Sequence, residues 1–192
     1  MARPREFDEQ HAVERAMHAF WDSGYEGTST EQLCAATGLG RSSIYNTFTS
    51  KHALFRRSLR HYSQTAHQRQ LELIEGAGTV RAKVRTLLTR LIEEELEHGR
   101  RGCLAVNTVV ELGGRDAEIS TDLRRDFDQL IEAWRAAIQR AQREGEIDRK
   151  ADPLALAQFI HSTVGGLRLM ARSGADRAAL ENVLEVALTT LR

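Results

Sequence analysis

The chain has 192 residues, 41% of them hydrophobic, and its 27 basic residues are balanced by 27 acidic ones. This length suffices for a sizeable core in one or two domains, and the neutral net charge gives no sign of a nucleic-acid partner. Cys34 and Cys103 form no CxxC pair, which argues against a disulfide framework or a zinc site. No apolar run reaches the ~18 residues of a membrane span, and no signal-peptide core is present. We therefore expect a cytoplasmic protein that needs no metal or other cofactor.

The N-terminal part predicts a loose arm followed by a helix. Because the chain has two prolines and no alternating strand pattern, an all-α fold is expected throughout. In the arm, residues 1–7, Arg3 and Arg5 either reach a minor groove of DNA or have no function. Asp8 can cap the first helix, which is predicted to end at Gly24. Its apolar stripe is typical of a helix that faces a core: Ala12, Val13, Ala16, Met17, Phe20 and Trp21.

Residues 28–51, TSTEQLCAATGLGRSSIYNTFTSK, have the pattern of two short helices joined by a glycine turn. The capping-box spacing that starts a helix is present at Thr28 and again at Ser29. Gly38 can end the first helix in the left-handed conformation, which costs glycine little. This arrangement is that of a helix-turn-helix, a motif that places its second helix in the major groove of DNA.

The second short helix, about Arg41–Phe48, separates into two faces at about 100° per residue. Ile44 and Phe48 fall on one side, and small polar side chains fall on the other. The polar face carries no carboxylate that would repel phosphate, and the helix is short enough to enter a major groove. A helix this polar is therefore expected to dock on a polar partner.

A longer helix is predicted to start at Ser50, its cap, and to continue to about Glu75. Six basic and no acidic residues lie between Arg41 and Gln70, which is a local surplus of positive charge on a neutral chain. This tract either faces DNA phosphates or is a solvated helix face. The charge distribution thus points to nucleic acid where the total charge does not.

Helical patterns continue after EGAGT at 75–79, the strongest boundary signal in the chain. The acidic run EEELE at 93–97 is predicted to be a solvated face rather than a metal site, because no His or Asp stands at ligand spacing. About nine helices are expected in all. The last four are predicted near 103–112, 116–144, 153–172 and after the turn at Ser173.

The segment GYEGTSTEQLCAATGLGRSSIYNTFTSKHALF resembles the DNA-binding domain of TetR/AcrR-type transcriptional repressors. The shared features are Gly-Tyr before the first short helix, Gly-Leu-Gly-Arg in the turn, Ile-Tyr-Asn-Thr-Phe on the second helix and Ser-Lys at the start of the next. The resemblance is strongest over residues 5–60. It implies a helix-turn-helix DNA-binding domain over residues 1–50 and a larger helical ligand-binding and dimerisation domain over residues 51–192.

The resemblance also implies that the chain binds a double-stranded DNA operator. Arg41 and Ser42 would then read base edges, Arg41 by a bidentate bond to guanine. Tyr45 would give its hydroxyl to a phosphate, and Asn46 would contact the DNA backbone or read adenine. The remaining expected backbone contacts are Thr28, Ser43, Thr47 and Lys51.

The two C-terminal helices either cover their own domain or, as the resemblance implies, pair with a second copy to form a homodimer. In the family, a small-molecule inducer enters the helical domain and moves the two reader heads apart. Several side chains here could line a mixed pocket, although each also suits a core. They are Asn107, Glu111, Phe127, Trp134, Phe159, His161 and Met170.

Cys103 is either a reactive sensor or an inert buried cysteine. It is expected at a helix N-terminus directly after Arg100 and Arg101, and both the helix dipole and the guanidinium charges would favour a thiolate. The segment RRGCLAVNTVVEL also resembles the corresponding segment in the branch of the family that senses electrophiles and oxidants through one cysteine. Alkylation or oxidation there would alter the packing beside the pocket.

The sequence therefore predicts a ligand-responsive transcriptional regulator, expected to be a repressor released from a palindromic operator by a small-molecule or electrophile inducer. Activation is also open, because promoter geometry decides between the two. Two other classes are an enzyme built on Cys103 and a helical interaction protein that has lost DNA binding. No nucleophile motif surrounds Cys103, and the acid-free tract from Arg41 argues against the interaction protein.

Overall fold

The structure, a computed structural model, describes residues 8–97 and 99–191, so the arm with Arg3 and Arg5 lies outside the described residues. Within these two ranges the predicted all-α fold is confirmed. The described residues form nine helices: α1 (Glu9–Gly27), α2 (Thr30–Thr37), α3 (Arg41–Phe48), α4 (Lys51–Glu75), α5 (Val80–Glu97), α6 (Leu104–Leu112), α7 (Ala117–Glu144), α8 (Pro153–Arg172) and α9 (Arg177–Thr189).

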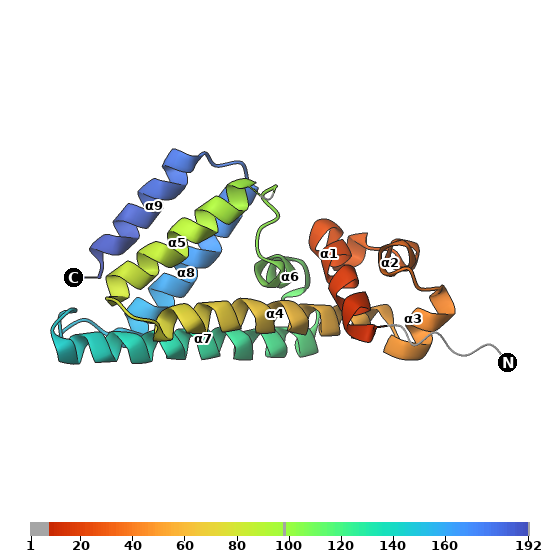
Figure 1. Cartoon of the computed structure of the whole chain (residues 1–192), viewed down its shortest axis with the longest axis horizontal. Coiled ribbons are helices and arrows are strands. Elements are labelled where there is room, and N and C mark those ends of the chain that lie inside the picture. Colours follow the sequence, from red (N-terminus) through yellow and green to blue (C-terminus); the bar gives the residue numbers. More distant parts are fainter. Residues whose placement is uncertain (1–7, 98, 192) are drawn as a thin grey trace.

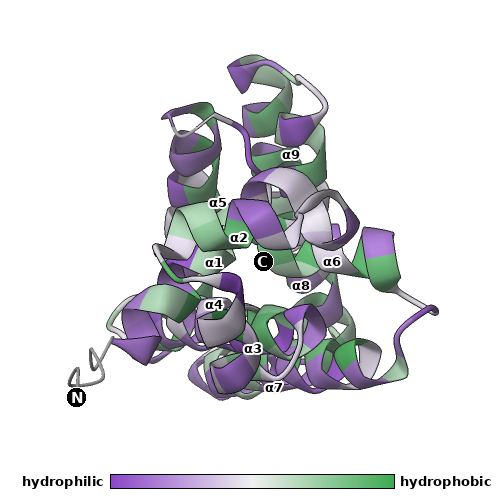
Figure 2. Cartoon of the chain, turned by 90° about the vertical axis from the view of Figure 1, so that its right-hand side faces the viewer, coloured by the Kyte–Doolittle hydropathy of each residue, from purple (hydrophilic) through white to green (hydrophobic). Residues whose placement is uncertain are grey.

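The two long helices α4 and α7 lie side by side along the long axis of the molecule (Figure 1). Helices α1, α2 and α3 gather at one end of α4, and we call them the reader unit. Helices α5, α8 and α9 pack together toward the other end, and α6 lies between the two groups. We call α5–α9 the body, to which α4 connects the reader unit. Seen from the reader end, the ribbons carry both hydrophilic and hydrophobic residues (Figure 2), as expected of helices with one buried face.

Polar side chains at the predicted caps start the helices of the reader unit. Ser29 and Gln32 form a complete capping box, so the second of the two possible boxes starts α2. Gly38 ends α2 in the left-handed conformation, as predicted. Helix α1 runs further than predicted. Gly24 interrupts it with φ 76° and ψ 172°, and one more turn continues to Gly27.

A first hydrophobic core lies under the reader unit and extends beyond it. The reader unit contributes α1 side chains such as Phe20, together with Leu33, Ile44 and Phe48. The other members come from the first half of α4 and from α6 and α7: Leu54, Phe55, Leu59, Leu104, Ala105, Leu112, Ile119 and Leu123. Hydrophobic packing therefore crosses residue 50, the predicted boundary between the two domains. The division into two domains at this residue stays a prediction.

A second core fills the body. It is built from buried side chains of α5, α7, α8 and α9, with Ile74 at the end of α4, and Trp134 is its largest fully buried member. The apolar stripes that the sequence shows in these helices meet here. None of the described helices is both long enough and apolar enough to cross a membrane.

We expect Phe20→Ala to lower the free energy of unfolding by about 3–5 kcal/mol, because truncating a buried aromatic leaves a cavity. The Phe20 side chain is 0% exposed, and its ring meets that of Phe55 edge-on at 4.9 Å between centroids. Urea unfolding followed by circular dichroism measures the change. Val110→Ala, at a site that is 74% exposed, is the control and should have almost no effect.

Candidate functional site

The recognition helix α3 has the two faces that the sequence predicts. Ile44 and Phe48 are buried in the first core. The opposite face is open to solvent, with Arg41, Ser42, Tyr45 and Asn46 exposed and with Ser43 and Thr47 half-buried at its flanks. These six predicted DNA-contact residues therefore lie on the exposed face of α3 and its flanks, which we call the reader surface.

Tyr45 is held on the reader surface by neighbours from two helices. Its hydroxyl lies 3.3 Å from the Thr30 hydroxyl in the first turn of α2. Hydrogen bonding by Thr30, and then by Arg41, lowers the pKa of the Tyr45 phenol below its ordinary value. Sequence reasoning did not identify Thr30, because only the crossing of α2 and α3 brings these hydroxyls together.

Lys51 follows the recognition helix and is positioned by α1. Its ammonium nitrogen lies 4.6 Å from the centre of the Tyr25 ring, a cation–π contact. Tyr25 in turn packs against the rings of Phe55 and His52. The final turn of α1 thus places a cation beside the reader surface.

Thr28 differs from the prediction. Its side chain is 1% exposed, and its hydroxyl donates to the Gly24 carbonyl at 2.6 Å. The hydroxyl satisfies a carbonyl left free where α1 is interrupted, so it holds the turn between α1 and α2. The predicted DNA contact through the Thr28 side chain does not fit this burial.

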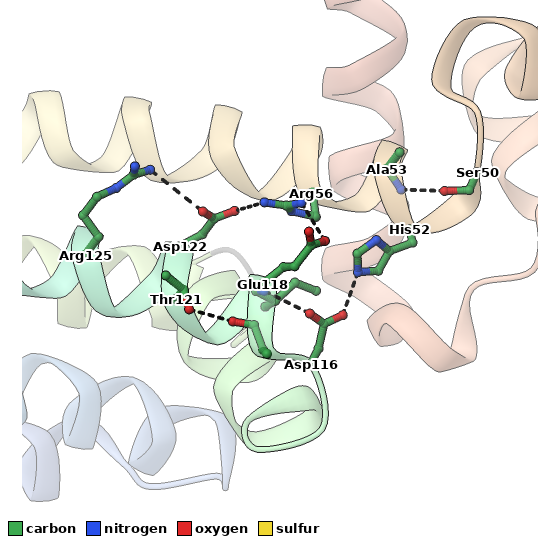
Figure 3. A network of polar contacts seen from close by, with 11 residues as sticks. Ser50, His52, Ala53, Arg56, Asp116, Glu118, Thr121, Asp122 and Arg125 are labelled. Carbon is green, nitrogen blue, oxygen red and sulfur yellow. Dashed lines mark hydrogen bonds and ion pairs between the residues drawn. The ribbon is translucent and has the colours of Figure 1, made fainter.

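Two of the six basic residues in the tract, Arg56 and Arg57, form ion pairs with acidic side chains. Arg56 makes ion pairs of 2.7 Å with both Glu118 and Asp122 of α7 (Figure 3). Arg57 pairs with Glu9 of α1. Acidic side chains distant in sequence therefore neutralise the middle of the tract, and whether the tract faces DNA phosphates stays a prediction.

The predicted pocket residues do not converge on one cavity. Trp134 and Met170 pack in the second core, while Phe159 is 40% exposed on α8. Phe127 and His161 do meet, with ring centroids 4.9 Å apart. A cavity of about 420 Å³ is present elsewhere, between α4 and α7, and none of the predicted pocket residues lines it.

Glu111 and Asn107 have structural partners near α1. The Glu111 carboxylate accepts the backbone N–H groups of Tyr25 and Glu26 at 2.9 and 2.7 Å. The Asn107 amide donates to the Arg101 carbonyl, which holds the loop before α6. Both residues therefore connect α6 to its surroundings, and Glu111 faces the reader unit instead of a pocket.

Cys103 is the N-cap of α6, as predicted, and is half-buried. The Tyr62 hydroxyl donates to its sulfur at 3.3 Å. Burial raises the pKa of Tyr62 well above its ordinary value, and the neighbouring Cys103 adds to this shift, so Tyr62 stays a neutral donor. The cysteine is thus held in a polar contact between α4 and α6.

The structure places near Cys103 a cation that the sequence did not identify. Arg100 donates to the Ala175 carbonyl, and Arg101 stacks over the Trp21 ring at 4.5 Å. Instead, α8 supplies Arg168, whose charge acts on both Cys103 and Tyr62. The guanidinium groups of Arg100 and Arg101 therefore have partners other than the Cys103 sulfur, and their effect on the thiol stays a prediction.

Arg168 is anchored by a buried glutamate from the acidic run. Glu95 is 4% exposed, accepts from Arg168 at 2.8 Å, and accepts the Gly102 N–H at 3.0 Å. The interpretation of 93–97 as a fully solvated face is wrong at this residue. The helical periodicity of the sequence indicates this burial, because Glu95 lies on the same helical face as Leu91 and Ile92.

An exposed polar recognition helix, supported by a three-helix unit on an all-helical body, defines a helix-turn-helix DNA-binding regulator. Comparison with known protein families agrees. Residues 12–57 match the bacterial regulatory proteins of the tetR family, and residues 80–187 match the tetracyclin repressor-like C-terminal domain. The chain therefore belongs to the TetR family.

Several individual proteins match the chain over nearly its whole length. It is 28% identical to the uncharacterized HTH-type transcriptional regulator YezE of Bacillus subtilis, with 100% of both chains covered. It is 29% identical to the HTH-type transcriptional repressor ComR of Escherichia coli, covering 99% of this chain and 90% of ComR. A cysteine mutant of the TetR family regulator CifR, solved in complex with 26-base-pair operator DNA, is 31% identical with a TM-score of 0.85 and 100% coverage of both chains.

Membership of this family decides between the functional classes. TetR-family proteins are DNA-binding transcription factors and not enzymes, so the chain is a transcriptional regulator, and an enzyme built on Cys103 is not favoured. An interaction protein without DNA binding is not favoured either, since the reader surface is exposed and intact.

We expect the stability of the contact between Asp116 and His52 to depend on pH. The Ile119 N–H, and then the His52 ring at 2.6 Å, hold the pKa of Asp116 below its ordinary value of 3.8. The ionised carboxylate therefore stabilises the fold above pH 3.8, and this contribution is lost as the pH falls through the lower folded pKa. Asp116→Asn keeps a capping side chain, so it should lower the free energy of unfolding at neutral pH but not in acid.

Urea unfolding at a series of pH values measures this difference. Asp176→Asn is the matched control, because Asp176 caps α9 by accepting the Ala179 N–H. Equal pH dependence in the two variants would contradict a role for His52.

Proposed function

We propose that the chain is a cytoplasmic homodimeric repressor. It binds a palindromic operator in double-stranded DNA and is released by a small-molecule or electrophile inducer. The observation that carries the proposal is the reader surface, whose polar side chains stand out from a helix anchored by Ile44 and Phe48. The likeness to CifR, solved with operator DNA, and to the repressor ComR supports it.

On the reader surface, base readout and backbone contact fall to different residues. Arg41 and Ser42 stand exposed at the leading end of α3 and are proposed to read base edges. Tyr45 and Lys51, both fixed by neighbouring side chains, are proposed to contact phosphates together with Ser43 and Thr47. Asn46 is assigned to the backbone or to adenine. Phosphate contacts set position and most of the affinity, and base contacts set sequence.

Dimerisation through α8 and α9 has support in the distribution of apolar side chains. Both helices contribute to the second core, yet they also leave large apolar residues in solvent: Leu154, Phe159, Leu169 and Val186. Burying such a surface against a second copy would be favourable. A two-fold dimer would present two reader surfaces to half-sites about one helical turn or more apart.

Cys103 is proposed as the point at which an electrophile acts. Its sulfur is half-buried in contact with Tyr62, beside the charged Arg168. An adduct on the sulfur would break the Tyr62 bond and displace the start of α6. A coupling of about 1–3 kcal/mol between this site and DNA would change operator affinity 5- to 150-fold.

We expect Arg41→Ala and Lys51→Ala to weaken DNA binding in different ways. Loss of a bidentate guanine contact should remove about 1–3 kcal/mol of discrimination, so Arg41→Ala binds specific and scrambled duplexes more equally. Loss of a phosphate contact should weaken binding to every sequence and reduce the salt slope by about 1, so Lys51→Ala keeps its specificity ratio. Fluorescence anisotropy at several salt concentrations measures both effects. An unchanged ratio in Arg41→Ala would refute its role in base readout.

We also expect N-ethylmaleimide to release a Cys34→Ser protein from DNA, because Cys103 is then its one remaining thiol. The expected loss of affinity is about 5- to 150-fold. The double variant Cys34→Ser/Cys103→Ser is the control and should keep its affinity under the same treatment. Equal release of the two proteins would show that Cys103 is not the sensor.

A further inference from the structure

The connection between α6 and α7 makes polar contacts with the last turn of α1, in the reader unit, and with the first turn of α4. Residues 111–116, with sequence ELGGRD, begin in the last turn of α6 and end at the cap of α7. The first and last residues of this connection are acidic, and both carboxylates bind groups next to the reader surface. The connection therefore joins the body to the reader unit in addition to α4.

Glu111 forms the first contact, in the manner of a helix cap from another helix. Gly24 interrupts α1 with φ 76°, which frees the N–H groups of Tyr25 and Glu26 from helical partners. The Glu111 carboxylate accepts both, at 2.9 and 2.7 Å, across about 85 residues of sequence. Hydrogen bonds to an ionised acceptor are about twice as strong as neutral ones. Gly24 adopts φ 76°, which L side chains rarely adopt, and a Cβ there would lie 2.8 Å from the carboxylate and force Glu111 to move.

Asp116 forms the second contact. It caps α7 through the Ile119 N–H and also bonds His52 in the first turn of α4 at 2.6 Å (Figure 3). The His52 ring meets the Tyr25 ring at 6.2 Å between centroids, and the same Tyr25 ring carries the Lys51 ammonium. Both contacts therefore involve Tyr25, whose ring also contacts Lys51, a proposed phosphate contact.

We infer that Glu111 is a positioning residue that fixes the angle between the reader unit and the body. In a dimer held by α8 and α9, this angle sets the distance between the two α3 helices. Glu111 thereby makes the protein select operators by the spacing of their half-sites. The inference rests on the proposed function, because spacing has meaning only for a dimer that binds two half-sites.

Binding to duplexes of altered spacing tests the inference. The full-length wild-type protein selects a duplex from random sequences, and variants of that duplex are made with one base pair added to or removed from the centre. Wild type should bind the selected spacing more tightly than the altered ones. In Glu111→Gln, one amide N–H₂ group faces the backbone donors in place of an oxygen, and the preference for the selected spacing should fall about tenfold. Affinity for a duplex with a single half-site should stay within twofold of wild type.

Glu132→Gln is the matched control, because Glu132 makes an exposed pair with Arg135 on α7. It should keep the wild-type preference for spacing. A residue that only stabilised the fold would lower the melting temperature without changing this preference, so both quantities are measured for each variant. If Glu111→Gln fails to fold, Glu111→Asp is tested in the same way. Its shorter side chain keeps the negative charge but places it farther from the backbone N–H groups of α1. Loss of helical structure in both variants would overturn the inference in favour of a purely structural role.

The outcomes separate the inference from the function on which it rests. A monomeric wild type, or one that selects no duplex, would overturn the proposed function and with it the inference. A wild type that discriminates spacing, with an equal preference in Glu111→Gln, would overturn the inference alone.

Discussion

The reader surface depends on the burial of Ile44 and Phe48. Helix α3 has eight residues, which is shorter than the ~12–15 that an isolated helix needs in water. Its two apolar side chains are almost completely buried in the first core. Burial of side chains of this kind contributes about 1.5–3 kcal/mol each and replaces the helical stability that the segment lacks. Because the same core includes α1, α4, α6 and α7, the position of the polar face reflects the packing of half the molecule.

That shared core supports the proposal that the body influences DNA binding. Helix α6 packs its apolar side chains Leu104 and Leu112 into the core of the reader unit. One end of α6 carries Cys103, and the other carries Glu111, bound to the end of α1. A short rigid helix with polar contacts at both ends transmits displacement instead of absorbing it, since packed cores deform little.

The polar groups around the start of α6 are connected to one another by hydrogen bonds. Glu95 bonds both Arg168 and the loop before Cys103, and Tyr62 bonds the cysteine itself. A buried ion pair of this kind contributes little net stability, but loss of one partner leaves an uncompensated charge. Such a network favours one arrangement of α5, α6 and α8 around the cysteine. A chemical change at the sulfur therefore acts on a site whose geometry is already specified.

The sequence by itself determined the fold class, most helix limits, the family and the two faces of α3. These follow from periodicity, caps such as Ser29 and Ser50, and turn glycines such as Gly38, all of which act within a few residues of one another. Only the tertiary structure decided which charges are free, because Arg56 meets its acidic partners more than sixty residues away. It also decided that Thr28 lies inside, that Arg168 accompanies Cys103, and that Glu111 faces α1. Local signals reveal a helix and its buried stripe, whereas the partner of a polar side chain depends on how distant helices cross.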